Sequence, residues 1–364
     1  MVIPGWMETM RRLQDITNSK YRILFPIALL STIKLVTAAW IFERLLLEGR
    51  SFGQVFVDWD SAFYLSLAQN GYPAWEGLSK RLYAFFPAYP ALIRVSFYIF
   101  HDYPLAAAVP ALILGVGSVA LFQLIGELYL SKTEALIGTI VFAFFPYVFL
   151  FTAVAYTEAL FLFSTLACWL LHKKQHPFLA AVFAAIATLT RLYGILIIVP
   201  VAFDLARKKR IRNLWTLTFP VACLLGWSYF CFSATGDWVA PLTSQRVAWG
   251  TIGLGEILCS VLYMKGSLPH GTDVALIAFF AILIFPVLRS FKVDSALGIY
   301  SALTFLLLLC AGSRISIVRY ASFIFPIWFT FPVNGLRSAL LCIPIFLIVS
   351  AALWFEFASG LWVA

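Results

Sequence analysis

Two carboxylates, Asp58 and Asp60, flank Trp59 within the segment that runs from Val57 to Pro73. A carboxylate at a water-facing position can accept a proton from an incoming hydroxyl group, so either acid could act as a general base. A structural role is also consistent with the spacing, because Asp60 or Ser61 could accept hydrogen bonds from the free amides of a helix's first turn. The two roles are compatible, since a helix cap also fixes the position of a carboxylate.

Glu158 and four arginines are the other charged residues that could do chemistry. Glu158 lies at the start of an apolar run, where an acid is expensive unless it is paired or functional. Arginines bind phosphate oxygens bidentately, so Arg191, Arg246, Arg314 and Arg319 predict a phosphate or pyrophosphate site. Each arginine could instead form a structural ion pair or extend to the membrane interface, and for Arg314 we favour that role.

The histidines and cysteines do not predict a metal site. His172 and His176 have the i, i+4 spacing of a metal-binding pair, but Lys173 and Lys174 lie between them, which indicates a solvated loop. The six cysteines form no Cys-x-x-Cys pair and lie mostly in apolar runs. Neither a disulfide framework nor a zinc site is therefore indicated.

The composition is that of a protein that crosses a membrane several times. Of the 364 residues, 62% are hydrophobic and 12% are charged, whereas soluble domains are ~45–50% apolar. The net charge of +9 comes from short basic blocks between apolar runs, which is the pattern that orients a membrane protein and not one that favours nucleic acid. We therefore expect an all-α polytopic membrane protein, with residues 1–364 forming a single domain.

The apolar runs and basic blocks predict about eleven membrane crossings. The N-terminus is expected in the cytoplasm, with a first outer loop over 48–104 and a second over 234–271. Apolar residues after Asp60 recur at three- and four-residue spacing, which predicts a short amphipathic helix on the membrane surface. Its apolar face is Phe63, Tyr64, Leu67 and Ala68, with Ser61, Ser66 and Gln69 elsewhere. Spans are expected near 23–47, 105–126, 134–151, 156–171, 214–232, 273–288, 295–312, 316–334 and 338–357.

The segment around Arg191 is expected to break within the membrane. The basic blocks at 172–176 and 207–212 are about thirty residues apart, which is too short for two full spans of ~20 residues each. We therefore predict a broken hairpin with Arg191 at its outer tip. Irregular backbone at membrane depth is tolerated only where it is buried in protein or lines a cavity.

Several motifs follow one another along nearly the whole chain: WDSAFYLSLAQNGY, AFFPAYP, AVAYTEALFLF, TRLYG at 190–194, SQRVAW and RYASFIFP. This series resembles the GPI mannosyltransferase 2 family and its prokaryotic relatives, which belong to the GT-C superfamily of polytopic glycosyltransferases. The WD-to-GY block followed by FFP-x-x-P is the specific part of the resemblance. The YTE and TRxxG pieces are weak alone and gain weight from their order.

The resemblance implies an inverting transferase that moves mannose or a similar hexose from a polyprenyl-phosphate donor to a hydroxyl of a lipid-linked or cell-surface glycan. The essential acid of the family's first outer loop matches Asp60, with Asp58 less securely matched. We expect Arg191, Arg246 and Arg319 to bind the donor phosphate. Glu158, Trp59, Tyr64 and Gln245 would support them. Some GT-C enzymes use a divalent cation and others use none, so a cation stays open, as does an accessory subunit.

A polyprenyl-phosphate or lipid transporter without transferase activity is the main alternative. It predicts charged residues along a path to the cytoplasmic side, whereas Asp58, Asp60, Glu158, Arg191 and Arg246 are all expected near one face. A polymerase or ligase of surface polysaccharide is a second alternative, which would not need the acid beside Trp59. We favour the transferase, at the extracytoplasmic side of a prokaryotic plasma membrane.

Overall fold

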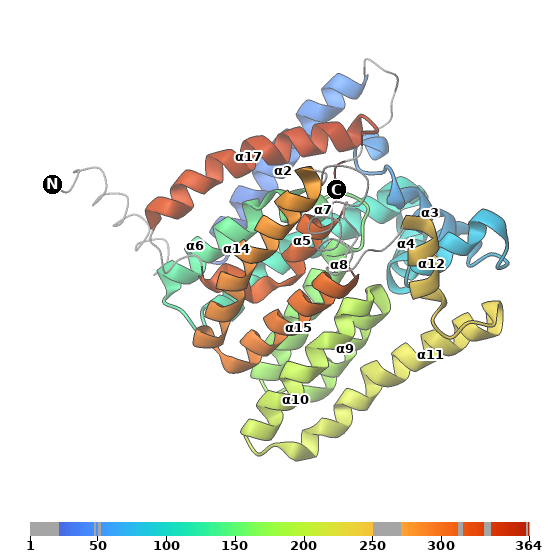
Figure 1. Ribbon diagram of the computed structural model, residues 1–364. Helices are drawn as coiled ribbons and strands as arrows, with labels where there is room; N and C mark the ends of the chain where they lie inside the picture. Colours follow the sequence, from blue (N-terminus) through green and yellow to red (C-terminus); the bar gives the residue numbers. More distant parts are fainter. Residues whose placement is uncertain are drawn as a thin grey trace.

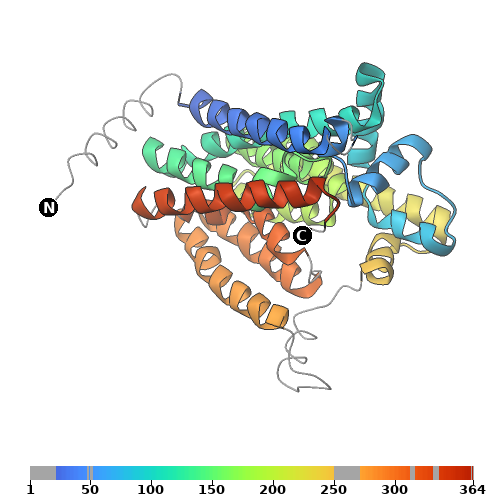
Figure 2. The same ribbon diagram turned by 90° about the horizontal axis from the view of Figure 1, so that it is seen from above.

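The computed structural model describes residues 22–46, 49, 52–249, 271–311, 316–330, 336–361 and 363. Every regular element in these ranges is a helix, and the helices form one bundle (Figures 1 and 2). In chain order they are α2 (Leu24–Leu46), η1 (Phe52–Val55), α3 (Asp60–Asn70), η2 (Gly77–Ala84), α4 (Ala88–Phe100), α5 (Tyr103–Gly126), α6 (Lys132–Phe144), α7 (Pro146–Phe151), α8 (Glu158–Lys173), α9 (Pro177–Thr190), η3 (Leu192–Ile197), α10 (Ile198–Arg207), η4 (Ile211–Leu217), α11 (Thr218–Thr235), α12 (Ala240–Trp249), α14 (Gly271–Val293), α15 (Ser295–Ala311), α16 (Ile317–Tyr320), η5 (Ala321–Phe323), η6 (Phe325–Thr330) and α17 (Leu336–Ala358). The predicted all-α class is confirmed for the described residues.

Four helical segments of the described chain are long and apolar enough to cross a membrane: Leu24–Leu46, Tyr103–Gly126, Ile211–Thr235 and Leu341–Ala358. A bent pair, η2 with α4, would raise the number to five. The predicted count of about eleven crossings is therefore not confirmed. Other predicted spans are shorter helices or are interrupted, as at Phe145 between α6 and α7.

The span predicted over 316–334 is not a continuous helix. Its described part consists of α16, η5 and η6, and each of them is too short to cross a membrane. Every residue of η6 is buried, and η6 packs against α6, α14 and α15. The apolar character of this run thus comes from a position inside the protein and not from contact with lipid.

Helix α8 lies at the centre of the bundle, between α5 and α9. Two glycines of α5 allow it to approach its neighbours closely. A Cβ on Gly117 would lie 2.7 Å from the Phe163 ring of α8, and a Cβ on Gly115 would lie 2.2 Å from the carbonyl oxygen of Thr152, which follows α7. Helices α2 and α17 pack together although they come from opposite ends of the chain (Figure 1). Helix α11 lies at the edge and packs against α9.

The predicted helix after Asp60 is α3, and it ends at Gly71, whose φ is +73°. Of its predicted apolar face, Tyr64, Leu67 and Ala68 are buried in the protein and Phe63 is half-buried, so a position along the membrane surface is not confirmed. Ser61 is also fully buried, so the prediction that it lies on the polar side is wrong. The predicted capping role is wrong as well, because neither the Asp60 nor the Ser61 side chain bonds an amide of the first turn in the described chain.

Candidate functional site

Four interruptions of helical structure meet around one charged cluster. They are the start of α3 at Asp60, the buried irregular segment 152–157 between α7 and α8, the junction at Arg191 between α9 and η3, and the short α16 that carries Arg319. The cluster therefore consists of residues that lie far apart in the sequence. Interrupted helices are tolerated there because the backbone is buried in protein.

Arg191 occupies the break between α9 and η3. Its backbone is extended, with φ −156° and ψ 151°, and the Gly194 amide donates to the Arg191 carbonyl oxygen at 2.9 Å. A Cβ on Gly194 would lie 2.1 Å from the Ala187 carbonyl carbon, so only glycine lets η3 fold so closely against α9. The predicted break at Arg191 agrees with this geometry.

Glu158, the first residue of α8, pairs with two arginines. Its Oε1 lies 2.7 Å from Arg191 Nη2 and 3.3 Å from Arg319 Nε. The Glu158 side chain is 1% exposed, that of Arg319 is 3% exposed and that of Arg191 is 14% exposed. Of the two arginines, Arg191 thus has the more exposed side chain.

Aromatic rings enclose both guanidinium groups. Arg319 lies 4.8 Å from the centroid of the Phe151 ring and 4.9 Å from that of Tyr320. Arg191 lies 5.1 Å from the centroids of both Tyr320 and Phe323. Rings stabilise a desolvated cation through their negative faces, so this enclosure holds the two charges in place at low exposure.

The residues just before Glu158 connect this pair to the rest of the site. Arg191 Nε donates to Thr157 Oγ1 at 2.6 Å, and the buried Tyr64 hydroxyl lies 3.4 Å from the same oxygen. The Tyr156 hydroxyl accepts a hydrogen bond from the Asp60 amide at 3.1 Å. Sequence reasoning singled out only Glu158 from the YTE motif and missed the roles of Tyr156 and Thr157.

Asp60 presents an unpaired carboxylate to this cluster. No hydrogen bond or ion pair reaches its carboxylate oxygens from the described residues, although Arg319 and Arg191 lie close enough to act on it electrostatically. Burial raises the pKa of the Asp60 carboxyl above its ordinary value, Arg319 and Arg191 oppose that rise, and Glu158 adds to it. A half-buried carboxylate of raised pKa can accept a proton more readily than an ordinary aspartate.

Asp58 differs from Asp60 because its carboxylate accepts a hydrogen bond from the backbone. Its Oδ1 accepts the Trp59 amide at 2.7 Å. Trp59 itself has a φ of +52°, a strained conformation for a non-glycine residue, and its indole N–H donates to the Leu361 carbonyl oxygen at 2.9 Å. The end of the chain therefore helps to fix the bend between the two acids.

The other predicted site residues lie apart from this cluster or outside the described part. Arg246 is exposed and Gln245 is half-buried on α12, which packs against η2 and α11. None of the hydrogen bonds or ion pairs described above involves either residue. Arg314 and the side chain of Trp249 lie outside the described residues.

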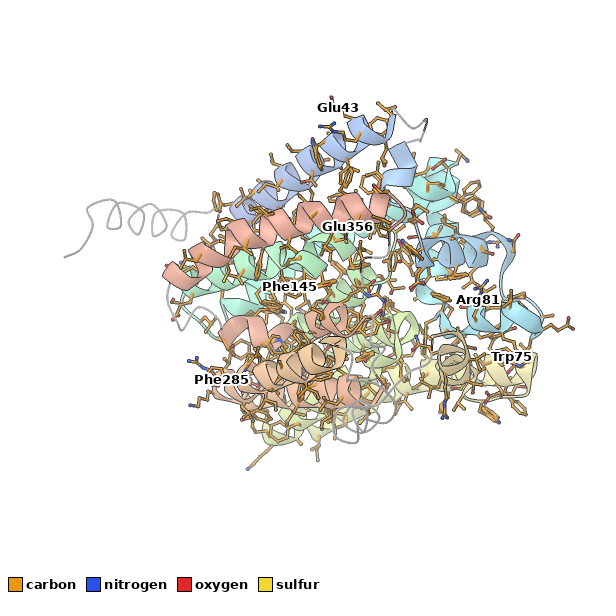
Figure 3. All side chains as sticks on the ribbon, turned by 45° about the horizontal axis from the view of Figure 1, so that its top comes forward. Glu43, Trp75, Arg81, Phe145, Phe285 and Glu356 are labelled. Atoms are coloured by element: carbon orange, nitrogen blue, oxygen red, sulfur yellow. The ribbon has the colours of Figure 1, made fainter. Side chains whose placement is uncertain are left out.

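Helix η2 brings two further cations to the end of the bundle that carries α3. The Arg81 guanidinium lies 4.9 Å from the centroid of the Phe63 ring of α3, and Lys80 Nζ lies 5.7 Å from that of Trp75. Figure 3 shows Arg81 and Trp75 at this end, away from Phe285. The first predicted outer loop therefore contributes aromatic and cationic side chains next to the helix of Asp60.

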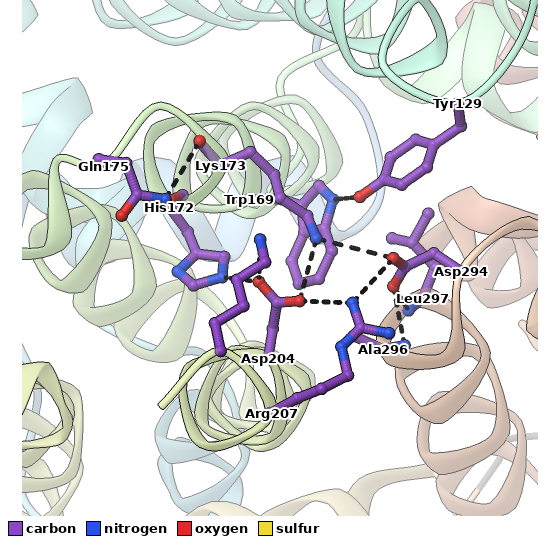
Figure 4. Close-up of polar contacts among 11 residues, drawn as sticks. Tyr129, Trp169, His172, Lys173, Gln175, Asp204, Arg207, Asp294, Ala296 and Leu297 are labelled. Carbon is purple, nitrogen blue, oxygen red and sulfur yellow. Dashed lines mark hydrogen bonds and ion pairs between the residues drawn. The ribbon is translucent and has the colours of Figure 1, made fainter. Parts of the chain in front are cut away.

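A second charged cluster joins the two basic blocks (Figure 4). Buried Asp204 on α10 accepts from His172 Nε2 at 2.8 Å and Arg207 Nη2 at 2.8 Å, and it pairs with Lys173 at 3.3 Å and Lys208 at 2.9 Å. The prediction that His172 is a solvated loop residue is wrong, because it is only 4% exposed. An acid inside the apolar sequence of α10 was the signal that could have located this cluster.

Metal ligands do not gather in the described part of the chain. No group of three or more histidine, cysteine, aspartate or glutamate side chains there could hold a metal ion. Asp58 and Asp60 are two acids on one bend, and a cation there would need its other ligands from water or from the phosphate of a substrate.

Comparisons with known proteins agree on the fold. A family model described as dolichyl-phosphate-mannose-protein mannosyltransferase matches residues 86–238. The crystal structure of ArnT from Cupriavidus metallidurans bound to undecaprenyl phosphate aligns with a TM-score of 0.57 and 10% identity, over 94% of this chain and 69% of that chain. The apo crystal structure of the Archaeoglobus fulgidus oligosaccharyltransferase aligns with a TM-score of 0.54 and 14% identity, over 95% of this chain and 57% of that chain. A comparison with curated protein sequences gives no match.

The fold is therefore that of these two solved structures. The sequence resemblance to the GT-C superfamily agrees with this fold. The more specific resemblance to the GPI mannosyltransferase 2 family stays a prediction.

Proposed function

We propose that this protein transfers a hexose, with mannose as the first candidate, from a polyprenyl-phosphate donor to a hydroxyl of a lipid-linked or cell-surface glycan. The reaction is a single displacement with inversion, at the extracytoplasmic side of a prokaryotic plasma membrane. The observation that carries this proposal is the Asp60 carboxylate, which no described residue pairs, within electrostatic reach of the partly exposed Arg191 side chain. A base and an oxyanion site next to each other are what glycosyl transfer from a phosphate requires.

The acid, the arginines and the substrate atoms have distinct roles in this mechanism. The acceptor oxygen attacks the anomeric carbon while the bond from that carbon to the phosphate oxygen breaks. Asp60 takes the proton of the acceptor hydroxyl, and the bonding electrons leave with the polyprenyl phosphate. Arg191 donates to the phosphate oxygens, where negative charge builds up in the transition state.

Arg319 acts mainly through Glu158 and Asp60 in this scheme. Its side chain is 3% exposed and its guanidinium is enclosed by rings. Arg319 therefore balances the charge of the two acids and does not bond the donor directly. Tyr64, through Thr157, supports Arg191. Arg246 and Gln245 on α12 would reach the donor or acceptor from the second outer loop.

The comparisons support a lipid-linked donor. The family model is named for dolichyl-phosphate-mannose, and the structural neighbour ArnT is bound to undecaprenyl phosphate. Both names describe a sugar or phosphate carried on a polyprenyl chain. An enzyme that works outside the cytosol needs such a carrier, because nucleotide sugars are made inside the cell.

The test is transfer of radiolabelled mannose from polyprenyl-phosphate-mannose to membrane lipid and glycan extracts by the purified protein. Asp60→Asn removes the base and keeps the shape of the side chain, so turnover should fall ~10²–10⁴-fold while donor binding remains. Glu356→Gln is the matched control, because it removes an exposed carboxylate on α17 (labelled in Figure 3) and should leave turnover unchanged. Asp58→Asn then compares the two acids beside Trp59.

Three results would count against the proposal. Full activity of Asp60→Asn would show that another acid is the base. A wild-type protein that transfers no polyprenyl-linked hexose yet binds polyprenyl phosphate would favour the transporter. Transfer from a soluble nucleotide sugar would overturn the lipid-linked donor.

A further inference from the structure

Lys34 is a buried lysine in the middle of α2, one of the helices long and apolar enough to cross a membrane. It is 2% exposed, and its ammonium group donates to Thr152 Oγ1 at 2.6 Å. The nitrogen also lies 5.4 Å from the centroid of the Phe149 ring. No carboxylate pairs with Lys34 among the described residues.

A lysine in this place is costly. Lysines near the ends of membrane helices extend their charge to the interface, but Lys34 lies well inside α2 and directs its nitrogen into the protein. Ionisable groups within apolar spans are rare because they must be desolvated, and those that occur generally have a function. The hydrogen bond to Thr152 therefore identifies where that function lies.

Thr152 is the first residue of the irregular segment 152–157. Its amide and its hydroxyl both donate to the Val148 carbonyl oxygen, at 3.1 and 2.5 Å, so it closes the end of α7. Gly115 of α5 lies directly against it, where a Cβ would come within 2.2 Å of the Thr152 carbonyl oxygen. Helices α2, α5 and α7 thus hold Thr152 from three sides.

The same segment carries the groups that hold the site. Its Ala155 amide donates to the Phe56 carbonyl oxygen at 2.8 Å, just before the two acids. Its Tyr156 hydroxyl accepts the Asp60 amide, and Thr157 Oγ1 accepts Arg191 Nε. A displacement at Thr152 would therefore move both the base and the phosphate-binding arginine.

We propose that Lys34 is a positioning residue, which fixes the start of segment 152–157 and thereby the hydroxyls of Tyr156 and Thr157 that orient Asp60 and Arg191. The role in catalysis rests on the proposed transferase activity, whereas the hold on the segment does not. Lys34 thus couples the first predicted membrane helix to a site that it does not itself contact.

The test compares Lys34→Met, Thr152→Val and their double variant with the wild type. Methionine keeps most of the lysine volume without the charge, and valine keeps the threonine shape without the hydroxyl. Lys174→Met is the control, because Lys174 is exposed in the loop after α8. Two quantities are measured: hydrogen exchange of the backbone amides of 152–157, and kcat with KM for polyprenyl-phosphate-mannose.

We expect faster exchange in 152–157 for both single variants, and a kcat that falls ~100-fold, as for a misplacement of ~1 Å, with little change in KM. The double variant should be no worse than Thr152→Val alone, because Thr152→Val already removes the bond between Lys34 and Thr152. If exchange in 152–157 is faster in the single variants but the wild type transfers no sugar, the role of Lys34 in holding the segment is supported and the proposed function is overturned.

Two results would overturn the inference itself. One is unchanged exchange in 152–157 together with unchanged kcat in both single variants. The other is faster exchange throughout the protein, with losses that add in the double variant, which would show that Lys34 serves only global stability.

Discussion

Removal of Glu158 and Arg319 together should cost less stability than the sum of the two single removals. Asp60, Glu158, Arg191 and Arg319 contribute two negative and two positive charges at low exposure, so the cluster is balanced. Glu158→Gln leaves one excess positive charge, Arg319→Met leaves one excess negative charge, and the double variant is balanced again. An unbalanced buried charge is the main cost of breaking such a cluster.

The expected sizes follow from the exposures and distances. Glu158 is 1% exposed and is the partner of both arginines, so Glu158→Gln should lower the free energy of unfolding by ~3–5 kcal/mol. Arg319→Met removes the 3.3 Å ion pair and leaves Glu158 paired with Arg191 at 2.7 Å, so its cost should be smaller, ~1–3 kcal/mol, as for a buried group that loses one of its partners. The loss of unfolding free energy in the double variant should be ~2 kcal/mol smaller than the sum of the two single losses.

The measurement is unfolding of the purified protein in mixed detergent micelles, followed by tryptophan fluorescence. Glu158→Gln combined with Lys174→Met serves as the control pair, because Lys174 is exposed at the opposite end of α8 and the two losses should add. Losses of Glu158→Gln and Arg319→Met that also add, to within ~0.5 kcal/mol, would refute charge balance as what holds the cluster together.

Three further predictions concern activity and packing. Burial raises the pKa of the Asp60 carboxyl, and the protonated acid cannot accept a proton. As the pH is lowered, kcat/KM should therefore begin to fall at a pH above ~3.9, the pKa of an ordinary aspartate. A profile that is flat down to pH ~3.9 contradicts this. Arg191→Lys should raise KM for the polyprenyl-phosphate donor ~10-fold, as for one lost charge-assisted hydrogen bond, and an unchanged KM would remove Arg191 from the donor site. Gly194→Ala should push η3 away from Ala187 and lower the unfolding free energy by ~1–3 kcal/mol, whereas Gly226→Ala, which meets no atom within 4 Å, should not; equal effects would contradict the close approach of η3 to α9.

The sequence predicted those parts of the site that rest on isolated charges. Arg191 was identifiable because a charge inside an apolar sequence is costly and needs a reason. Asp60 was identifiable because a carboxylate at a water-facing position can act as a base. Their immediate partners were not, because the bond between the Asp60 amide and Tyr156 joins residues 96 positions apart. Tyr156 and Thr157 have no unusual property until the fold brings them to those partners.

Exposure was the second quantity that sequence reasoning could not supply. Arg319 was expected to bind phosphate directly, and the structure encloses it between Phe151 and Tyr320. His172 was expected in solvent, and the structure buries it against Asp204. An arginine or histidine that follows an apolar run can face water or the core, and only the packing of the neighbouring helices decides between them.

The apolar run at 316–334 shows why the crossings could not be counted from hydropathy alone. A residue packed inside a helical bundle and one facing lipid are equally apolar, so both give the same signal. Pro326 in η6 lacks the amide that a continuous helix would need, which favours short turns in this place. Length and hydropathy therefore identified apolar segments correctly, and their assignment to core or bilayer required the fold.

The site lies where helices are interrupted, and the physical cause is the same at each interruption. A continuous helix satisfies its own backbone and leaves no amide or carbonyl group for a ligand or a neighbouring residue. At Asp60, Tyr156, Arg191 and Arg319 the helix begins, ends or is too short, so side chains and backbone can converge from four directions. The buried bond between Lys34 and Thr152 belongs to this arrangement, since an irregular segment without helical hydrogen bonds needs other contacts to keep one conformation. A charge that falls between two short apolar runs is therefore a better guide to the site of such a protein than the hydropathy of the runs themselves.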